Sequence, residues 1–208
     1  DEGENEVFLR ATMESKLYSK KLFDLKTNSL FRTVGFEAGF GDGRKYPAIP
    51  LNKGKFKVTG KIDRVDEYEN YFRVMDYKTG HFNSTEEGLF TGTSLQLYLY
   101  SIAVSLKDGK KPAGMYYLPV DEGFMKDGQK DSFISSGKTL SDLEVLSAQD
   151  SQFETTKKAF GVSVTKEGKI KGGSTKESID SHLKYALSMC ENATDQMASG
   201  VIAQTPFD

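Results

Sequence analysis

The chain has 208 residues, of which 37% are hydrophobic and 28% charged, and its formal net charge is −2. This composition is typical of a soluble globular chain, and the length favours one domain with a substantial core. No apolar run has membrane-spanning length, so we expect a cytoplasmic protein without membrane partners. The near-neutral charge does not suggest nucleic-acid binding, because basic DNA-binding domains usually have a high isoelectric point.

Hydrophobic patterns predict the first elements in chain order. Residues 7–25 are predicted to form a helix, and residues 31–40 a strand with a glycine-rich exit. Two strands with period-two alternation follow over residues 55–65 and 71–78. The polar residues 67–70 separate these strands, so the sequence predicts a β-hairpin.

The second half of the chain alternates between helical and strand patterns. A helix is predicted over residues 94–106, a strand over 113–120, a polar loop over 121–130, a short helix over 140–148, a small hairpin over 162–170, and a last helix from a capping sequence at 174–177 to Gly200. Strands flanked by helices predict a single α/β domain with a mixed central sheet.

Two aspartates interrupt the apolar pattern of the hairpin. Asp76 continues the row of Phe72 and Val74, where an apolar residue is expected. Lys78 projects from the same strand face because it is two residues further on. Asp63 is expected at the end of the preceding strand. The hairpin therefore brings two carboxylates and one ammonium group toward one point, where they can bind a divalent cation and activate water.

Each of these features also has an ordinary structural explanation. An aspartate near a strand end often forms a turn or half of a surface ion pair. Gln96 and Tyr100 share one helix face at i and i+4, and taken alone they are ordinary helix and core residues. Their place directly after the Asp-Tyr-Lys strand favours a polar helix face turned toward a site. The lysines before the hairpin and beyond residue 156 are more often a solvated face than a phosphate track.

The run GKIDRVD…VMDYKTG…LQLYLY resembles the RecB-type branch of the PD-(D/E)XK nuclease superfamily, especially the AddB-like subunits of bacterial helicase–nucleases. Weaker segments in the same order extend the resemblance over nearly the whole chain; they are TVGFEAGFG from residue 33, KPAGMYYLP from residue 111, and residues 136–147 and 180–206. The resemblance implies a restriction-endonuclease-like fold over residues 1–208, with a central mixed sheet flanked by helices.

The resemblance also implies roles for individual residues. Asp63 and Asp76 are the implied metal-binding carboxylates, the Tyr77 carbonyl completes the shell, Glu37 lies near the metal, Lys78 holds the attacking water and offsets charge at the phosphate, and Gln96 and Tyr100 position Lys78 or the DNA strand. The implied cofactor is Mg²⁺ or Mn²⁺, and the implied partners are DNA and a helicase–nuclease partner subunit.

The implied function is that of a metal-dependent DNA exonuclease domain, which hydrolyses phosphodiester bonds when double-strand ends are processed for recombinational repair. The alternative is a nuclease-like domain that binds DNA or a partner without cutting. Intact Asp63, Asp76 and Lys78 favour the first function. No histidine-rich, cysteine-rich or Ser-His-Asp pattern in the sequence competes with this interpretation.

Two departures from the family pattern matter. The relatives carry a histidine metal ligand on an upstream helix, whereas the histidines here are His81 and His182. AddB-like subunits often bind an iron–sulfur cluster through four cysteines, and this chain has only Cys190, which we interpret as a plain thiol. We therefore expect an excised piece, truncated at both ends, with weak or no activity alone; a cluster is expected only in a longer parent.

Overall fold

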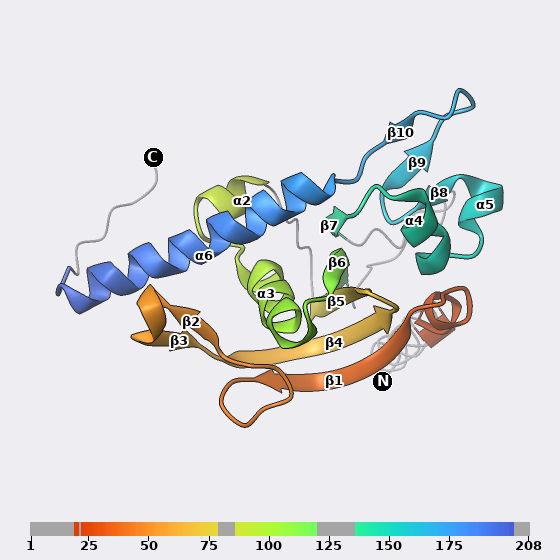
Figure 1. The fold of residues 1–208 in the computed structure, drawn as a ribbon. Coiled ribbons are helices and arrows are strands. Elements are labelled where there is room, and N and C mark those ends of the chain that lie inside the picture. The colour runs from red at the N-terminus through yellow and green to blue at the C-terminus, as the bar shows by residue number, and fades with distance from the viewer. Residues whose placement is uncertain (1–18, 21, 79–85, 120–135, 202–208) are drawn as a thin grey trace, which may run out of the picture.

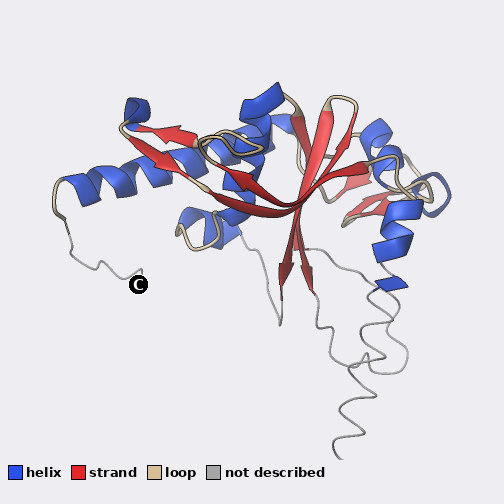
Figure 2. Ribbon diagram, turned by 90° about the horizontal axis from the view of Figure 1, so that it is seen from below, coloured by secondary structure: helices blue, strands red, loops and turns tan. Residues whose placement is uncertain are grey.

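The computed structural model describes residues 19–20, 22–78, 86–119 and 136–201. At the centre of this part of the chain lies a five-stranded sheet in the order β1-β4-β5-β6-β7. Its strands are β1 (Arg32–Phe40), β4 (Gly60–Tyr68), β5 (Tyr71–Lys78), β6 (Lys111–Pro119) and β7 (Ser136–Thr139). β5 and β6 run parallel and the other neighbours antiparallel, so the sheet is mixed as predicted. Figure 2 shows its pronounced twist.

Helices flank the sheet and confirm the α/β class (Figure 1). The helix α3 (Gln96–Asp108) packs on β5 and β6, and the long helix α6 (Lys176–Ala198) packs on α3. The shorter helices are α2 (Glu86–Phe90), α4 (Leu143–Gln149) and α5 (Phe153–Thr156). Residues 19–20 and 22–27 are also helical. None of the described helices is both long enough and apolar enough to cross a lipid bilayer.

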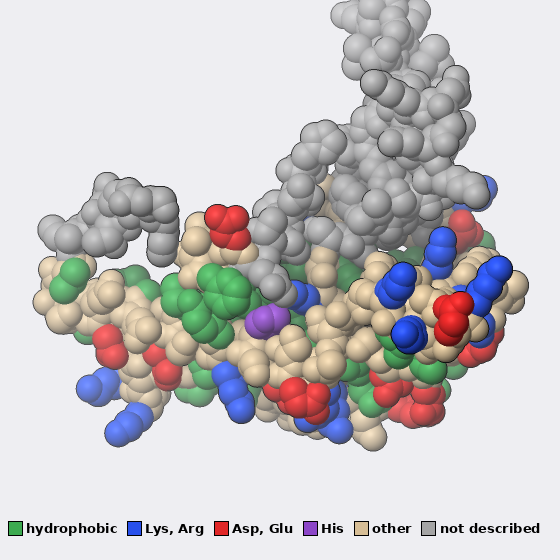
Figure 3. Space-filling model, turned by 90° about the horizontal axis from the view of Figure 1, so that it is seen from above, with side chains coloured by type: hydrophobic (Ala, Val, Ile, Leu, Met, Phe, Trp, Pro, Cys, Tyr) green, Lys and Arg blue, Asp and Glu red, His purple; other side chains and the backbone are tan. Residues whose placement is uncertain are grey.

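Two small sheets complete the described chain. β2 (Ile49–Leu51) and β3 (Phe56–Val58) form a hairpin around the helical turn η1 (Asn52–Gly54). The second sheet contains β8 (Lys158–Ala159), β9 (Val162–Val164) and β10 (Ile170–Lys171), and its β9–β10 hairpin was predicted. Figure 3, which looks down on α6, shows basic side chains gathered at the end of the molecule that carries this sheet.

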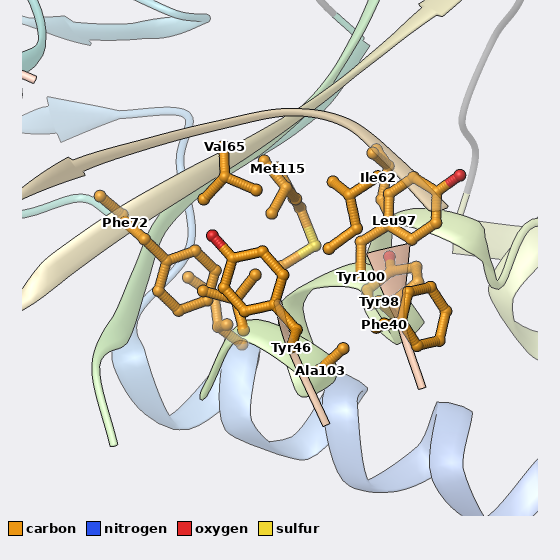
Figure 4. Packing of buried hydrophobic residues seen from close by; sticks show 14 of the residues in the cluster. Phe40, Tyr46, Ile62, Val65, Phe72, Leu97, Tyr98, Tyr100, Ala103 and Met115 are labelled. Atoms are coloured by element: carbon orange, nitrogen blue, oxygen red, sulfur yellow. The ribbon is translucent and has the colours of Figure 1, made fainter. Parts of the chain in front are cut away.

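The main core lies between α3 and the sheet (Figure 4). Ile62, Phe72 and Met115 from the sheet belong to the same buried cluster as Leu97 and Ala103 from α3. Burying one such large apolar side chain contributes roughly 1.5–3 kcal/mol. The packing of α3 on β5 therefore fixes which residues of these two elements face each other.

Helix ends follow the local sequence. α3 ends at Gly109, whose φ of 69° lies in the left-handed region that glycine adopts without strain. Thr175 caps α6 as its side chain accepts a hydrogen bond from the Ser178 N–H at 3.2 Å, as the capping sequence predicted. Asp142 plays the same part for α4, which begins three residues later than the predicted helix.

Two predictions about the hairpin were wrong. The strand expected over residues 55–65 is two strands, β3 and β4, because the chain changes sheets at Thr59. Gly60 allows this change, since a Cβ there would come within 2.7 Å of the Phe40 ring. The predicted loop at residues 67–70 is also shorter, because Tyr68 pairs with Tyr71 and only Glu69 and Asn70 form the turn.

Several predictions fall outside the described residues. These are the predicted helix over residues 7–25 up to residue 18, the residues 79–85 with His81, the predicted loop at 121–130, and the chain end from residue 202. The helix α2, in contrast, is a described element that the sequence patterns did not predict.

Candidate active site

A chain of polar contacts links the end of β5 to the first turns of α3. Asp76 and Lys78 project from the face of β5 that α3 covers, and Lys78 Nζ lies 2.7 Å from Asp76 Oδ2. Lys78 Nζ also donates to Gln96 Oε1 at 2.8 Å. Gln96 Nε2 donates to the Tyr100 hydroxyl oxygen at 2.7 Å. Tyr100 in turn hydrogen-bonds to Asp76, so these four side chains form one connected network.

Asp63 joins this network from β4. Its Oδ2 accepts the backbone N–H of Tyr77 at 2.9 Å, directly between Asp76 and Lys78 in the chain. Asp63 lies inside β4, so the expectation that it ends its strand was wrong. The regular pairing of β4 with β5 instead stops at Arg64 and Met75, one residue short of Asp63. A side-chain contact thus takes the place of the strand ladder where β4 and β5 separate.

Burial and charge set the electrostatics of the site. Asp76 is only 2% exposed, and this burial, together with the nearby Asp63 charge, raises its pKa although Lys78 acts in the opposite direction. Burial and the two carboxylates raise the pKa of Tyr100 to about 12, so its hydroxyl is a neutral donor at neutral pH. The network therefore holds more negative charge than Lys78 alone offsets.

The donor set fits a hard divalent cation. Two carboxylates, from Asp63 and Asp76, face the same region as the Tyr77 backbone, and all three groups offer oxygen atoms. Mg²⁺ is commonly held by one or two carboxylates while it keeps several waters and contacts substrate phosphates. The raised pKa of Asp76 indicates that a cation between these groups would relieve an existing repulsion.

Glu37 is not drawn into this cluster. It lies at the surface and forms an ion pair with Lys61, with 62% of the Glu37 side chain exposed. Within the described ranges, no group of three His, Cys, Asp or Glu side chains is placed to hold a metal ion. Cys190 is a half-buried free thiol, and His182 packs edge-on against Tyr98. A role for Glu37 beside a metal stays a prediction.

Sequence reasoning missed Tyr117. The parallel pairing of β5 with β6 places Tyr117 opposite Asp76. Its ring lies beside the Lys78 ammonium, which is 5.2 Å from the ring centroid, within the range of a cation–π contact. The sequence predicted β6 as a strand, but no local pattern sets the register between two parallel strands that are joined through a helix.

The fold and this site define a class of protein. A family profile described as the PD-(D/E)XK nuclease superfamily matches residues 5–208, so the chain belongs to that superfamily, as the resemblance predicted. Nucleases of this superfamily are generally dependent on divalent metal ions.

Particular relatives narrow the comparison. The chain is 28% identical over 242 residues to an ATP-dependent helicase/deoxyribonuclease subunit of Thermoanaerobacter sp. (strain X514), an alignment that covers 99% of this chain and 21% of the relative. It is 30% identical over 205 residues to the protein of the same name in Caldanaerobacter subterraneus subsp. tengcongensis, with 86% of this chain and 18% of the relative covered. For Clostridium novyi the identity is 32% over 164 residues, covering 67% of this chain and 14% of the relative. The chain thus spans about a fifth or less of the length of these relatives.

Proposed function

We propose that this chain is the nuclease domain of a helicase–nuclease and hydrolyses phosphodiester bonds in DNA with the help of Mg²⁺ or Mn²⁺. The observation that carries the proposal is the connected network of Asp76, Lys78, Gln96 and Tyr100, with Asp63 anchored on the Tyr77 N–H. The relatives' names, which combine helicase and deoxyribonuclease, support the same function. An exonuclease mode and a part in double-strand end processing belong to the same proposal.

The residues of the chain have separate tasks in this proposal. Asp63, Asp76 and the Tyr77 carbonyl hold the cation, which when bound polarises the phosphate and lowers the pKa of a bound water. Lys78 is fixed by Asp76 and Gln96 with 26% of its side chain exposed, so its charge remains accessible to a phosphate. Charge that is held in position beforehand stabilises the negative charge that develops on phosphate oxygens in the transition state.

Asp76→Asn and Lys78→Ala test the proposal. With Mg²⁺ or Mn²⁺, each variant should cleave linear DNA about 100–1000-fold more slowly than the parent chain, as expected when one preorganised charge is lost. Asp24→Asn is the matched control, because Asp24 is exposed on the helix before β1. Parent-like cleavage by either site variant would contradict the assignment.

Metal binding gives a readout that does not depend on cleavage. At a concentration of 100 times its dissociation constant, Mg²⁺ or Mn²⁺ should stabilise the parent chain by about 2.7 kcal/mol and raise its melting temperature. The double variant Asp63→Asn/Asp76→Asn should show no such increase.

A second candidate function is DNA or partner binding without cleavage. It is favoured by the observation that two carboxylates, and no third acidic or histidine side chain, converge in the described part of the chain. DNA binding without measurable cleavage and without a metal-dependent rise in melting temperature would select this second function.

A further inference from the structure

An open cavity of about 520 Å³ lies at the end of α3 that is remote from the candidate active site. Its wall includes four cationic side chains and one carboxylate, namely Arg44, Lys45, Lys57, Lys107 and Asp42. Lys107 is in the last turn of α3, whereas Gln96 is the first residue of the same helix. At a rise of about 1.5 Å per residue, the two ends of this stretch of α3 are roughly 16 Å apart.

Glycines shape the loop that carries Arg44 into this cavity. Gly39 lets the Arg44 side chain lie directly on the strand, because a Cβ there would come within 3.2 Å of Arg44 Cδ. Gly43 has a φ of 69°, a left-handed conformation that suits glycine. The Gly41 N–H donates to the Tyr46 carbonyl at 2.9 Å, and the Tyr46 N–H donates to the Gly39 carbonyl at 3.2 Å. The loop between β1 and β2 therefore holds its basic side chains in a defined place.

The positive charge of the cavity is only partly offset by its own neighbours. Lys57 Nζ lies 2.7 Å from Asp42, and Lys107 Nζ lies 3.8 Å from Asp108. Lys45 donates to the backbone carbonyl of Val34, which carries no formal charge. None of the ion pairs between described residues includes Arg44. A chain with a net charge of −2 thus concentrates cations at this cavity.

We propose that this cavity binds the sugar–phosphate backbone of a DNA strand, a few nucleotides away from the bond held in the candidate active site. The planar guanidinium of Arg44 suits two phosphate oxygens, and the lysines add point charges that are tolerant of base sequence. The roughly 16 Å along α3 corresponds to about five nucleotide steps at the ~3.4 Å rise of duplex DNA. The inference rests on the proposed nuclease function for its ligand.

The double variant Arg44→Gln/Lys107→Gln tests this site. Binding of a fluorescent single-stranded oligonucleotide is measured by anisotropy in EDTA, so that neither cleavage nor a site metal contributes. Each phosphate contact on single strands contributes about 0.7 to the slope of log K against log salt concentration. The double variant should therefore bind at least about tenfold more weakly at low salt, with a slope shallower by about 1.4.

Lys169→Gln/Lys171→Gln is the charge-matched control. These exposed lysines border the β9–β10 hairpin, at the end of the molecule where Figure 3 shows a second gathering of basic side chains. The control should keep the parent affinity and salt slope. A charge-preserving variant, Arg44→Lys/Lys107→Arg, should keep most of the slope, and this separates loss of charge from loss of folding.

Three outcomes would overturn the inference. In the first, the parent chain binds no oligonucleotide. In the second, the cavity variant and the control lose affinity equally, which shows a diffuse charge effect. In the third, oligonucleotide binding is unchanged while binding of a poly-glutamate peptide is lost, which assigns the cavity to an acidic protein segment. Because binding is measured in EDTA, loss of DNA cleavage in the active-site variants fails the proposed function without deciding this inference.

Discussion

Lys78 shows how single residues at the candidate site depend on one another. Its ammonium group contacts Asp76 on its own strand and Gln96 on α3. Gln96 is held in turn by Tyr100, one helical turn further on. The position of the Lys78 charge is thus set by residues that are not themselves expected to touch the phosphate.

Gln96→Ala tests this dependence. The change removes the acceptor that holds Lys78, and we expect kcat to fall by about 10–100-fold, as is typical when an outer partner of a reactive group is lost. KM should change little, because a positioning residue does not bind DNA directly. Single-turnover cleavage with saturating enzyme measures the chemical step.

Tyr100→Phe is the companion variant, because it removes only the hydroxyl that holds Gln96 and Asp76. It should show a smaller defect than Gln96→Ala. Equal kcat values for Gln96→Ala and the parent chain would show that Lys78 does not need this support.

At the scale of elements, a buried ion cluster joins β4 to β5 on the sheet face opposite α3. Arg64 makes two hydrogen bonds to Asp66, at 2.8 and 2.9 Å, and Arg73 makes a third at 3.0 Å. Asp66 and Arg73 are fully buried, and the Arg73 guanidinium lies between the rings of Phe31 and Phe160. The cluster fixes the register of the two strands next to Asp63 and Asp76.

Asp66→Ala should destabilise the fold by about 3–5 kcal/mol, because it leaves two buried guanidinium groups without their counter-ion. Urea unfolding at neutral pH measures this loss. Asp24→Asn, an exposed carboxylate change, should leave the free energy of unfolding nearly unchanged.

The same cluster predicts an acid-dependent stability. Burial opposes the charge of Asp66, but the hydrogen bonds of Arg64 and the charge of Arg73 outweigh it and lower its pKa. A carboxylate with a lowered folded-state pKa contributes stability above its unfolded value of about 3.9, and this contribution is lost as the pH falls through the folded-state pKa. Asp66→Asn should therefore flatten the loss of stability below pH ~4. An unchanged acid limb in the urea midpoint would contradict this.

At the scale of the whole molecule, α6 ties the β2–β3 hairpin to the rest of the domain. Asn52, at the start of η1, donates through its side-chain amide to the Glu191 carbonyl at 3.2 Å and to Thr194 and Asp195 at 2.8 Å. Its backbone has a φ of 48°, a left-handed conformation that asparagine tolerates better than most residues. One residue thus joins two elements that are about 140 positions apart in the sequence.

Asn52→Ala should lower the free energy of unfolding by about 1–3 kcal/mol, since it removes the amide contacts and puts alanine in a left-handed conformation. Asn52→Gly separates the two effects, because glycine accepts that conformation but makes no side-chain contact. The glycine variant should lose less stability than the alanine variant in chemical unfolding. The reverse order would show that the backbone conformation carries no cost here.

The sequence by itself determined the elements and part of the site. Alternation placed Asp76 and Lys78 on one strand face, and the i, i+4 spacing placed Gln96 beside Tyr100, because both patterns follow from local backbone geometry. Capping chemistry located the start of α6 for the same reason. The family resemblance, carried by the motifs around these residues, led to the mixed α/β fold and the superfamily that the comparisons confirm.

Only the tertiary structure decided how distant segments meet. The change of sheet at Thr59, the side-chain contact of Asp63 with the Tyr77 N–H, and the place of Tyr117 opposite Asp76 depend on strand register and helix packing. The separation of Glu37 from the carboxylates and the basic cavity at the end of α3 depend on the same long-range geometry. Such contacts arise from packing between residues far apart in sequence, and local periodicity carries no information about them.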